Sequence, residues 1–195
     1  NTVKTYSSIF NAVQNAPDTA TGPYRIYINK GRYVEKIIID KPFIHFVGED
    51  IYTTILIYNL AQGSFNTETN EPWGNSCASL IILASHFSAQ NMTIENSFDY
   101  NRNAQKDESD PSKIKDTQGL AIRTGLGSDK LFFKNVYFKG HQDTVFAQFG
   151  RQLYKNCIIE GHVDFIYGAA QAIFDSCTIL VKMRNKLPVG FICAP

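Results

Sequence analysis

Two consecutive stretches of the chain, FFKNVYFKGHQD (132–143) and LYKNCIIEGHVD (153–164), align residue for residue without a gap. Aromatic, Lys and Asn positions coincide, and both copies end in Gly-His-x-Asp. The two terminal aspartates, Asp143 and Asp164, are therefore one repeat of 21 residues apart. A fixed period of this size predicts a repeat architecture.

Two shorter copies extend the period in both directions. FSAQNMTIEN (87–96) lies upstream and IFDSCTILV (173–181) lies downstream. Each copy is a short run rich in Ile, Val, Phe and Tyr with period-two alternation, which is typical of a strand. No copy contains an amphipathic segment long enough for a helix, which argues against leucine-rich and helical solenoids. The pattern predicts an all-β fold, a parallel β-helix in which each strand pairs with its equivalent in the next coil.

The flanking segments fit the same architecture. A Ser start, apolar residues at helical spacing and a terminating Pro predict a short helix in SSIFNAVQNAP (7–17) that caps the open end of the stack. Further strands are expected within 25–40, 43–50 and 79–87. Two polar, turn-rich stretches, 59–76 and 97–116, are expected to be loops that build a binding face. The KDESD cluster in the second is expected to be a solvated acidic loop rather than a calcium site.

Coil stacking would bring the two aspartates together. Equivalent residues of adjacent coils lie roughly 4.8 Å apart, the strand spacing of a sheet. Two carboxylates that close share a proton, and one pKa rises. Such a split pair is a common basis for acid–base chemistry near neutral pH. The alternative is that Asp143 and Asp164 only stabilise turns, and the spacing does not decide between the two.

Other side chains should stack in the same way. Cys157 and Cys177 become neighbours, either as a disulfide or as two reduced cysteines in a buried ladder. His141 and His162 also stack, but a metal site is not expected there, because a ligating His and the Asp two residues on would point in different directions. A ladder of amide side chains is expected at one position of successive coils: Asn91, Asn135 and Asn156.

Composition excludes several function classes. The net charge is +1, from 19 basic and 18 acidic residues, so there is no electrostatic basis for binding nucleic acid or an anionic membrane. No apolar run approaches the roughly 20 residues that span a bilayer. The length of 195 residues and hydrophobic content of 44% fit one domain over residues 1–195.

Four motifs, in order, resemble those of the pectin methylesterases. They are GRYVE (31–35), QGLAIRT (118–124), GHQDTVF (140–146) and GHVDFIYG (161–168). The resemblance covers most of the chain, from about Tyr6 to Cys177. It implies a right-handed parallel β-helix that removes methyl esters from galacturonate in pectin, outside the cell at the cell wall, as a monomer and without metal or organic cofactor.

The resemblance also implies roles for individual residues. Asp164 matches the family's nucleophile, and Asp143 matches its general acid, which later acts as a base. The side-chain amides of Gln118 and Gln142 match donors to the oxyanion. Two aromatic side chains match positions that line the substrate cleft: Phe146 and Tyr167.

One family segment, Leu-Gly-Arg-Pro-Trp, has no counterpart before Pro195, so the domain is expected to be incomplete at its C-terminal end. Arg123, Arg151 and Arg184 do not lie in that context. Two other functions stay open: a β-helix enzyme that cleaves the polysaccharide, such as a galacturonase or lyase, and a non-catalytic pectin-binding solenoid. A glycosidase has no obvious use for a Gln directly before one aspartate and another one coil earlier, which favours the esterase, whereas the missing Arg segment gives weight to the non-catalytic solenoid.

Overall fold

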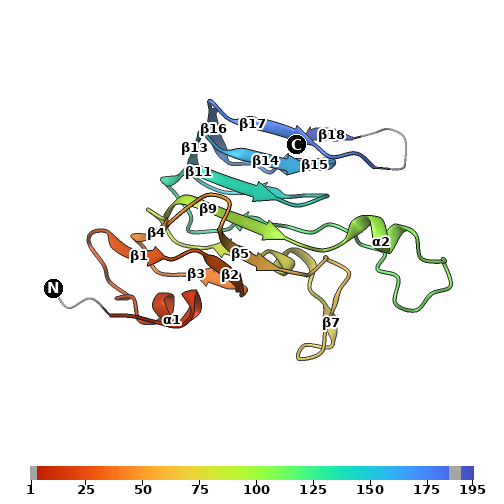
Figure 1. Ribbon diagram of the computed structural model, residues 1–195, viewed down its shortest axis with the longest axis horizontal. Helices are drawn as coiled ribbons and strands as arrows, with labels where there is room; N and C mark the ends of the chain where they lie inside the picture. The colour runs from red at the N-terminus through yellow and green to blue at the C-terminus, as the bar shows by residue number, and fades with distance from the viewer. Residues whose placement is uncertain (1–3, 185–189) are drawn as a thin grey trace.

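The computed structural model describes residues 4–184 and 190–195. Figure 1 shows its strands stacked as successive coils, from the N-terminal end of the chain to the C-terminal end. Nearly all pairs of strands are parallel, and each joins a strand to its counterpart one coil later. The predicted all-β parallel β-helix is confirmed.

Two parallel sheets form the walls of the coils. The ten-stranded sheet contains β1 (Tyr24–Ile28), β2 (Gly31–Val34), β4 (Ile44–Gly48), β5 (Thr54–Tyr58), β9 (Ser88–Asn96), β11 (Leu131–Lys139), β13 (Arg151–Lys155), β14 (Ile158–Gly161), β16 (Gln171–Asp175) and β17 (Thr178–Val181). The six-stranded sheet contains β3 (Ile37–Ile39), β8 (Leu80–Ile82), β10 (Ile122–Thr124), β12 (Val145–Ala147), β15 (Val163–Tyr167) and β18 (Phe191–Ala194).

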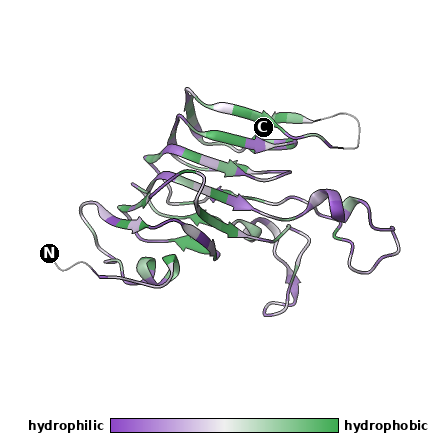
Figure 2. Cartoon of the chain, viewed as in Figure 1, coloured by the Kyte–Doolittle hydropathy of each residue, from purple (hydrophilic) through white to green (hydrophobic). Residues whose placement is uncertain are grey.

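The register of these sheets is the register of the sequence repeat. Phe133 of β11 pairs with Tyr154 of β13, and Tyr154 pairs with Phe174 of β16. The three rings stack inside the coil, with centroid distances of 4.8 and 4.6 Å. Offset ring pairs of this kind add about 0.5–1.5 kcal/mol each beyond the area they bury. Figure 2 shows the hydrophobic residues concentrated on the strands and the hydrophilic ones on the protruding loops.

The helix α1 (Ile9–Gln14) covers the N-terminal end of the stack, as predicted (Figure 1). The Ser8 side chain accepts a hydrogen bond from the Asn11 amide and caps the first turn. Ile9 and Val13 are buried in the main core. The helix therefore removes from water the apolar end that the first coil would otherwise expose.

Left-handed backbone marks one bend of each coil within the ten-stranded sheet. Asn91, Asn135, Asn156 and Ser176 occupy equivalent positions there, with φ of 54°, 52°, 53° and 56°. Asn tolerates this conformation better than other residues that carry a Cβ. The Asn135 amide donates to Asn91 Oδ1 over 3.1 Å, which confirms this step of the predicted ladder. We refer to these four residues as the Asn corner.

The two insertions contain more regular structure than the predicted loops. The first holds a hairpin of β6 (Phe65–Asn66) and β7 (Glu71–Pro72), followed by the 3₁₀ helix η1 (Gly74–Cys77). The second holds the helix α2 (Tyr100–Ala104), whose first turn is capped by Asp99. These elements are too short to give a periodic signal, which is why the prediction missed them.

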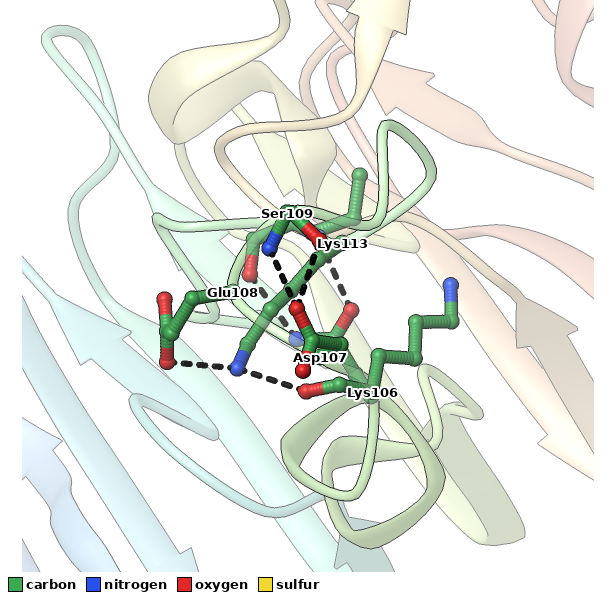
Figure 3. A network of polar contacts seen from close by, with 7 residues as sticks. Lys106, Asp107, Glu108, Ser109 and Lys113 are labelled. Atoms are coloured by element: carbon green, nitrogen blue, oxygen red, sulfur yellow. Dashed lines mark hydrogen bonds and ion pairs between the residues drawn. The ribbon is translucent and has the colours of Figure 1, made fainter.

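The acidic side chains Asp107 and Glu108 form hydrogen bonds and an ion pair with neighbouring residues of the same insertion, as Figure 3 shows. Asp107 accepts from the amide and hydroxyl of Ser109 at 2.9 and 2.6 Å. The Lys113 ammonium donates to Glu108 at 2.6 Å and to the Lys106 carbonyl at 2.8 Å. Within residues 4–184 and 190–195 there is no group of three His, Cys, Asp or Glu side chains placed to hold a metal ion.

The structure distinguishes between the two alternatives for the stacked cysteines, a disulfide or two reduced thiols. Cys157 and Cys177 are neighbours, but both are free thiols and no disulfide joins them. Each thiol instead donates to a carbonyl of the preceding coil, Cys157 to Phe133 and Cys177 to Tyr154. The alternative of two reduced cysteines in a ladder therefore holds.

None of the helices in the described part of the chain is long and apolar enough to cross a membrane.

Candidate active site

The two aspartates lie at the bend where the chain passes from the ten-stranded to the six-stranded sheet. Asp143 and Asp164 have φ of 61° and 48°, so both bends need a residue that tolerates left-handed backbone. The Asp143 amide donates to the Val163 carbonyl at 3.1 Å, and Gln142 bridges to Val163. These bonds fix one coil directly above the other. We refer to Asp143 and Asp164 as the Asp corner.

The glycine of each Gly-His-x-Asp motif permits this tight bend. A Cβ on Gly161 would lie 2.3 Å from the Phe165 Cβ and 2.7 Å from the His141 carbonyl oxygen. A Cβ on Gly140 would lie 2.7 Å from the Thr144 hydroxyl. Because a Cβ at any of these three distances would force its neighbour to move, glycine lets each Asp-bearing turn pack closely against its own coil and, at Gly161, against the preceding coil.

The environments of the two carboxylates differ. Asp143 is 9% exposed, whereas Asp164 is only partly buried. Burial, with a further contribution from the charge of Asp164, raises the pKa of Asp143 to about 7. The Tyr167 hydroxyl and the Gln142 amide act in the opposite direction and keep this pKa from rising further. At neutral pH the pair can thus hold one proton, on Asp143.

The two glutamines lie in adjacent coils beside the carboxylates. The Gly119 amide donates to the Gln142 carbonyl at 3.0 Å, which sets Gln118 one coil before Gln142. The Thr117 hydroxyl donates to Gln142 Oε1 at 3.0 Å, so the NH₂ of Gln142 is left to face Asp143. The Gln118 Oε1 atom is buried and has no hydrogen-bond partner among the residues that the structure describes.

The predicted aromatic pair forms a wall of the same site. The rings of Phe146 and Tyr167 stack at 4.3 Å with an angle of 6° between their planes. Arg123 of β10 is the register neighbour of Phe146 and continues this ladder toward the N-terminal end. Its Nε is buried without a hydrogen-bond partner in the described part of the chain. The ladder therefore presents two flat rings and one cation on the outer face of the six-stranded sheet.

A small apolar cluster packs against Phe146, one of the two aromatic residues of the site. It contains Cys77, Ala78, Ile81 and Leu120, with Trp73 and Phe146 packed against it. Burial raises the pKa of the Cys77 thiol to about 11, so this thiol is neutral and unreactive at ordinary pH. The Lys36 ammonium lies 5.3 Å from the centroid of the Trp73 ring.

The histidines of the two motifs pack against the second insertion. The rings of His141 and His162 are 5.4 Å apart, and Tyr100 of α2 lies 4.4 Å from His162 and 6.2 Å from His141. Burial lowers the pKa of each imidazole to about 4, so both are neutral at ordinary pH. They act as flat apolar surfaces on which α2 docks beside the Asp corner.

The pectinesterase family model matches residues 1–194 of the chain. The chain belongs to the pectinesterase family. It is 37% identical over 188 residues to pectinesterase A of Dickeya dadantii (strain 3937), an alignment that covers 96% of this chain and 51% of the relative.

Solved structures of pectin methylesterases share the fold of this family member. One, in complex with a hexasaccharide, superposes with a TM-score of 0.95 at 35% identity and covers 99% of this chain and 57% of its own. The enzyme from Erwinia chrysanthemi gives a TM-score of 0.94 at 35% identity and covers 98% and 57%. The chain thus spans little more than half the length of the relatives that it matches.

Within this pectinesterase chain, the structure brings together all six residues assigned from the motifs. Asp143, Asp164 and the two glutamines meet at one bend, and the aromatic pair follows on the next strands. Sequence reasoning assigned no role in the site to two neighbours, Arg123 and Cys77. Arg123 precedes Phe146 by one coil, so aligning QGLAIRT with the later repeats could have found it. Cys77 comes from an insertion outside the period, and the sequence carried no signal for it.

Proposed function

We propose that this member of the pectinesterase family hydrolyses methyl esters of galacturonate in pectin and releases methanol. The observation that carries the proposal is the asymmetric carboxylate pair: Asp143 is buried with a pKa of about 7, and Asp164 is more exposed in the next coil. Relatives named pectinesterase, and a pectin methylesterase solved with a hexasaccharide, support the choice of substrate. Because pectin is an extracellular polymer, we propose that the protein acts outside the cell. We also propose that it acts as a monomer.

Asp164 is the nucleophile in this proposal. Its ionised carboxylate attacks the carbonyl carbon of the ester and forms a tetrahedral intermediate. The carbon–oxygen bond to the methoxy group then breaks, and protonated Asp143 gives its proton to the departing methanol. The product at this stage is an anhydride between Asp164 and the uronate carboxyl group.

The second half of the reaction reverses the role of Asp143. As a carboxylate it takes a proton from water, and the oxygen of that water attacks the anhydride. The uronate leaves as a free acid, and Asp164 returns to its carboxylate form. The pKa of about 7 suits both roles, because a group that titrates near the working pH can give and take a proton.

Gln118 and Gln142 stabilise the charge that develops on the ester oxygen. Each side-chain NH₂ can donate a hydrogen bond, and one such donor contributes roughly 3 kcal/mol to the transition state. The Thr117 hydroxyl donates a hydrogen bond to Gln142 Oε1, which leaves the NH₂ end of that amide to face the ester oxygen. The stacked rings of Phe146 and Tyr167 give sugar rings a flat surface.

The test is methanol release from methyl-esterified pectin by the full-length gene product that contains these residues. We expect methanol without shortening of the polymer, and Asp164→Asn should reduce the rate about 10⁴-fold or more. Asp50→Asn is the matched control, because Asp50 is an exposed turn residue whose backbone hydrogen bonds Asn can also accept. It should keep full activity.

New reducing ends without methanol would identify a polysaccharide-cleaving enzyme instead. Binding of pectin with no turnover in the full-length protein would identify a non-catalytic solenoid. Full activity of Asp164→Asn with an unchanged melting temperature would refute the assignment of the nucleophile while leaving the reaction itself in place.

A further inference from the structure

A groove lies on the outer face of the ten-stranded sheet, apart from the residues of the carboxylate site. It has a volume of about 600 Å³ and crosses β1, β4, β9 and β11, which follow one another up the stack (Figure 1). This volume is in the range of sites that hold small organic ligands. None of the residues assigned to the reaction lines it.

One wall of the groove is a ladder of outward-facing side chains from four successive strands. Arg25 pairs with His45, His45 with Ser88, and Ser88 with Phe132. The Ser88 hydroxyl and His45 Nδ1 lie 2.9 Å apart and are hydrogen-bonded. At the strand spacing of a sheet the ladder is about 14 Å long and runs parallel to the axis of the stack.

The other wall comes from a bend of left-handed residues, here called the aromatic corner: Phe43, His86 and Lys130. Their φ angles are 61°, 59° and 54°. The rings of Phe43 and His86 stack at 4.4 Å with an angle of 16° between them. Left-handed backbone costs a bulky residue roughly 1–2 kcal/mol, and strained residues of this kind concentrate at functional sites.

The groove carries two cations without carboxylate partners. Neither Arg25 nor Lys130 forms an ion pair with any of the residues that the structure describes. Asp129, the acid next to Lys130, is bound by the Arg151 guanidinium. The groove thus combines positive charge, flat rings and hydrogen-bonding side chains.

We propose that this groove binds an acidic oligosaccharide, namely a short run of unesterified galacturonate. Arg25 and Lys130 would pair with the uronate carboxylates. The Phe43–His86 stack and Phe132 would contact the apolar faces of the sugar rings, and Ser88 and Gln90 would bind hydroxyl groups. The choice of galacturonate over other acidic sugars rests on the proposed function, since it is the product of that reaction.

The distribution of histidines makes the proposal directly testable. The chain has four histidines. His45 and His86 line the groove, and His141 and His162 lie beside the Asp corner. Their imidazole NMR signals therefore report separately on the two sites. The titration uses the Asp164→Asn full-length protein, so that turnover cannot change the ligand, with the signals of these four histidines assigned individually by His→Gln variants.

We expect unesterified trigalacturonate to shift the signals of His45 and His86. The double variant Arg25→Gln/Lys130→Gln should weaken this binding at least tenfold. Phe43→Asn, which suits the left-handed backbone but removes the ring, should weaken it several-fold. The matched control is Lys30→Gln/Arg32→Gln, which removes the same charge from exposed positions outside the groove and should leave the binding unchanged.

Three further ligands define the chemistry. Fully methyl-esterified trigalacturonate lacks the charges, neutral maltotriose lacks carboxyl groups, and sodium acetate lacks the sugar, so none should shift His45 and His86 comparably. Shifts confined to His141 and His162 would overturn the proposal and leave the esterase function intact. Groove binding in a wild-type protein that releases no methanol would reject the esterase function and keep an acidic-sugar site.

Discussion

The Asn corner and the Asp corner both place residues with left-handed backbone at a bend of each coil, but their side chains differ in chemistry. Each is a column of left-handed residues, with φ between 48° and 61°, stacked one per coil along the β-helix. In the Asn corner the side chains are neutral, and the amide of Asn135 donates a hydrogen bond to that of Asn91. The Asp corner stacks two carboxylates, one of which is buried. The coil needs residues that tolerate left-handed backbone at both bends, and under the proposed function the exchange of amide for acid makes the Asp corner the reactive one.

The two corners also differ in what they do for stability. An amide ladder satisfies both partners and carries no charge. The Asp corner instead holds Asp143 at a pKa of about 7, because burial and a neighbouring charge disfavour its ionised form. A carboxyl group held in this way lowers the stability of the folded protein at pH values where it is ionised, but it can give and take a proton near neutral pH. Catalytic sites commonly combine these two properties.

Among the changes that test the comparison of the two corners, the largest expected effect comes from replacing the buried acid of the Asp corner by the amide of the Asn corner. Asp143→Asn keeps a residue that tolerates left-handed backbone but removes the proton donor. We expect methanol release to fall about 10³-fold, within the usual range for loss of a general acid. In the wild type, the rate of methanol release should decline as pH rises through about 7, because Asp143 then loses the proton that methanol needs.

The pH profile separates a catalytic from a structural role. If Asp143 only shaped the bend, Asp143→Asn would leave the rate unchanged, since Asn occupies the same conformation in the Asn corner. If it acts as proposed, the residual activity of the variant should lose the inflection near pH 7. Circular dichroism of the variant provides the check that the β-helix is intact.

The next effect is on stability, and it has the opposite sign. The folded-state pKa of Asp143, about 7, lies above its ordinary value of 3.8. The folded protein therefore binds the proton more tightly, and this contribution to stability is present at low pH and is lost as pH rises from about 4 to 7. Asp143→Asn, which has no charge to bury, should stabilise the protein above pH 7 by on the order of 2–4 kcal/mol.

Urea denaturation at pH 4 and pH 8 measures this difference. The gain should be large at pH 8 and absent at pH 4. Asp175→Asn is the contrasting control, because Ser176 and Lys155 lower the pKa of Asp175 and its removal should destabilise the protein at pH 8. Equal stabilisation by Asp143→Asn at both pH values would show that Asp143 is not held in its protonated form.

The period of the sequence was sufficient to predict the fold and the strand register. FFKNVYFKGHQD and LYKNCIIEGHVD lie side by side as the gapless alignment requires, because parallel pairing in a β-helix transfers sequence offset directly into spatial register. The stacking of the Asn side chains followed from the same argument. The left-handed φ of both corners did not, since Asn and Asp are common in many kinds of turn.

Features outside the period could not be predicted. The helix α2 depends on a single Asp99 cap and on docking of Tyr100 against two histidines from later coils. The disulfide alternative failed because proximity in register does not determine the direction of a thiol, and both thiols bond to carbonyls instead. The groove on the ten-stranded sheet joins residues of four coils whose positions share no motif.

The smallest expected effect comes from separating backbone tolerance from side-chain bonding in the Asn corner. Asn135→Ala removes the hydrogen bond to Asn91 and puts a residue that tolerates left-handed backbone less well than Asn at this position, which together should cost about 2–3 kcal/mol of unfolding free energy. Asn135→Gly removes only the bond, because glycine adopts this φ freely, and should cost about 1 kcal/mol. Urea midpoints of the two variants give the difference directly. If Ala and Gly cost the same, left-handed strain does not select the residues of this corner, and the shared backbone requirement that links it to the Asp corner would be wrong.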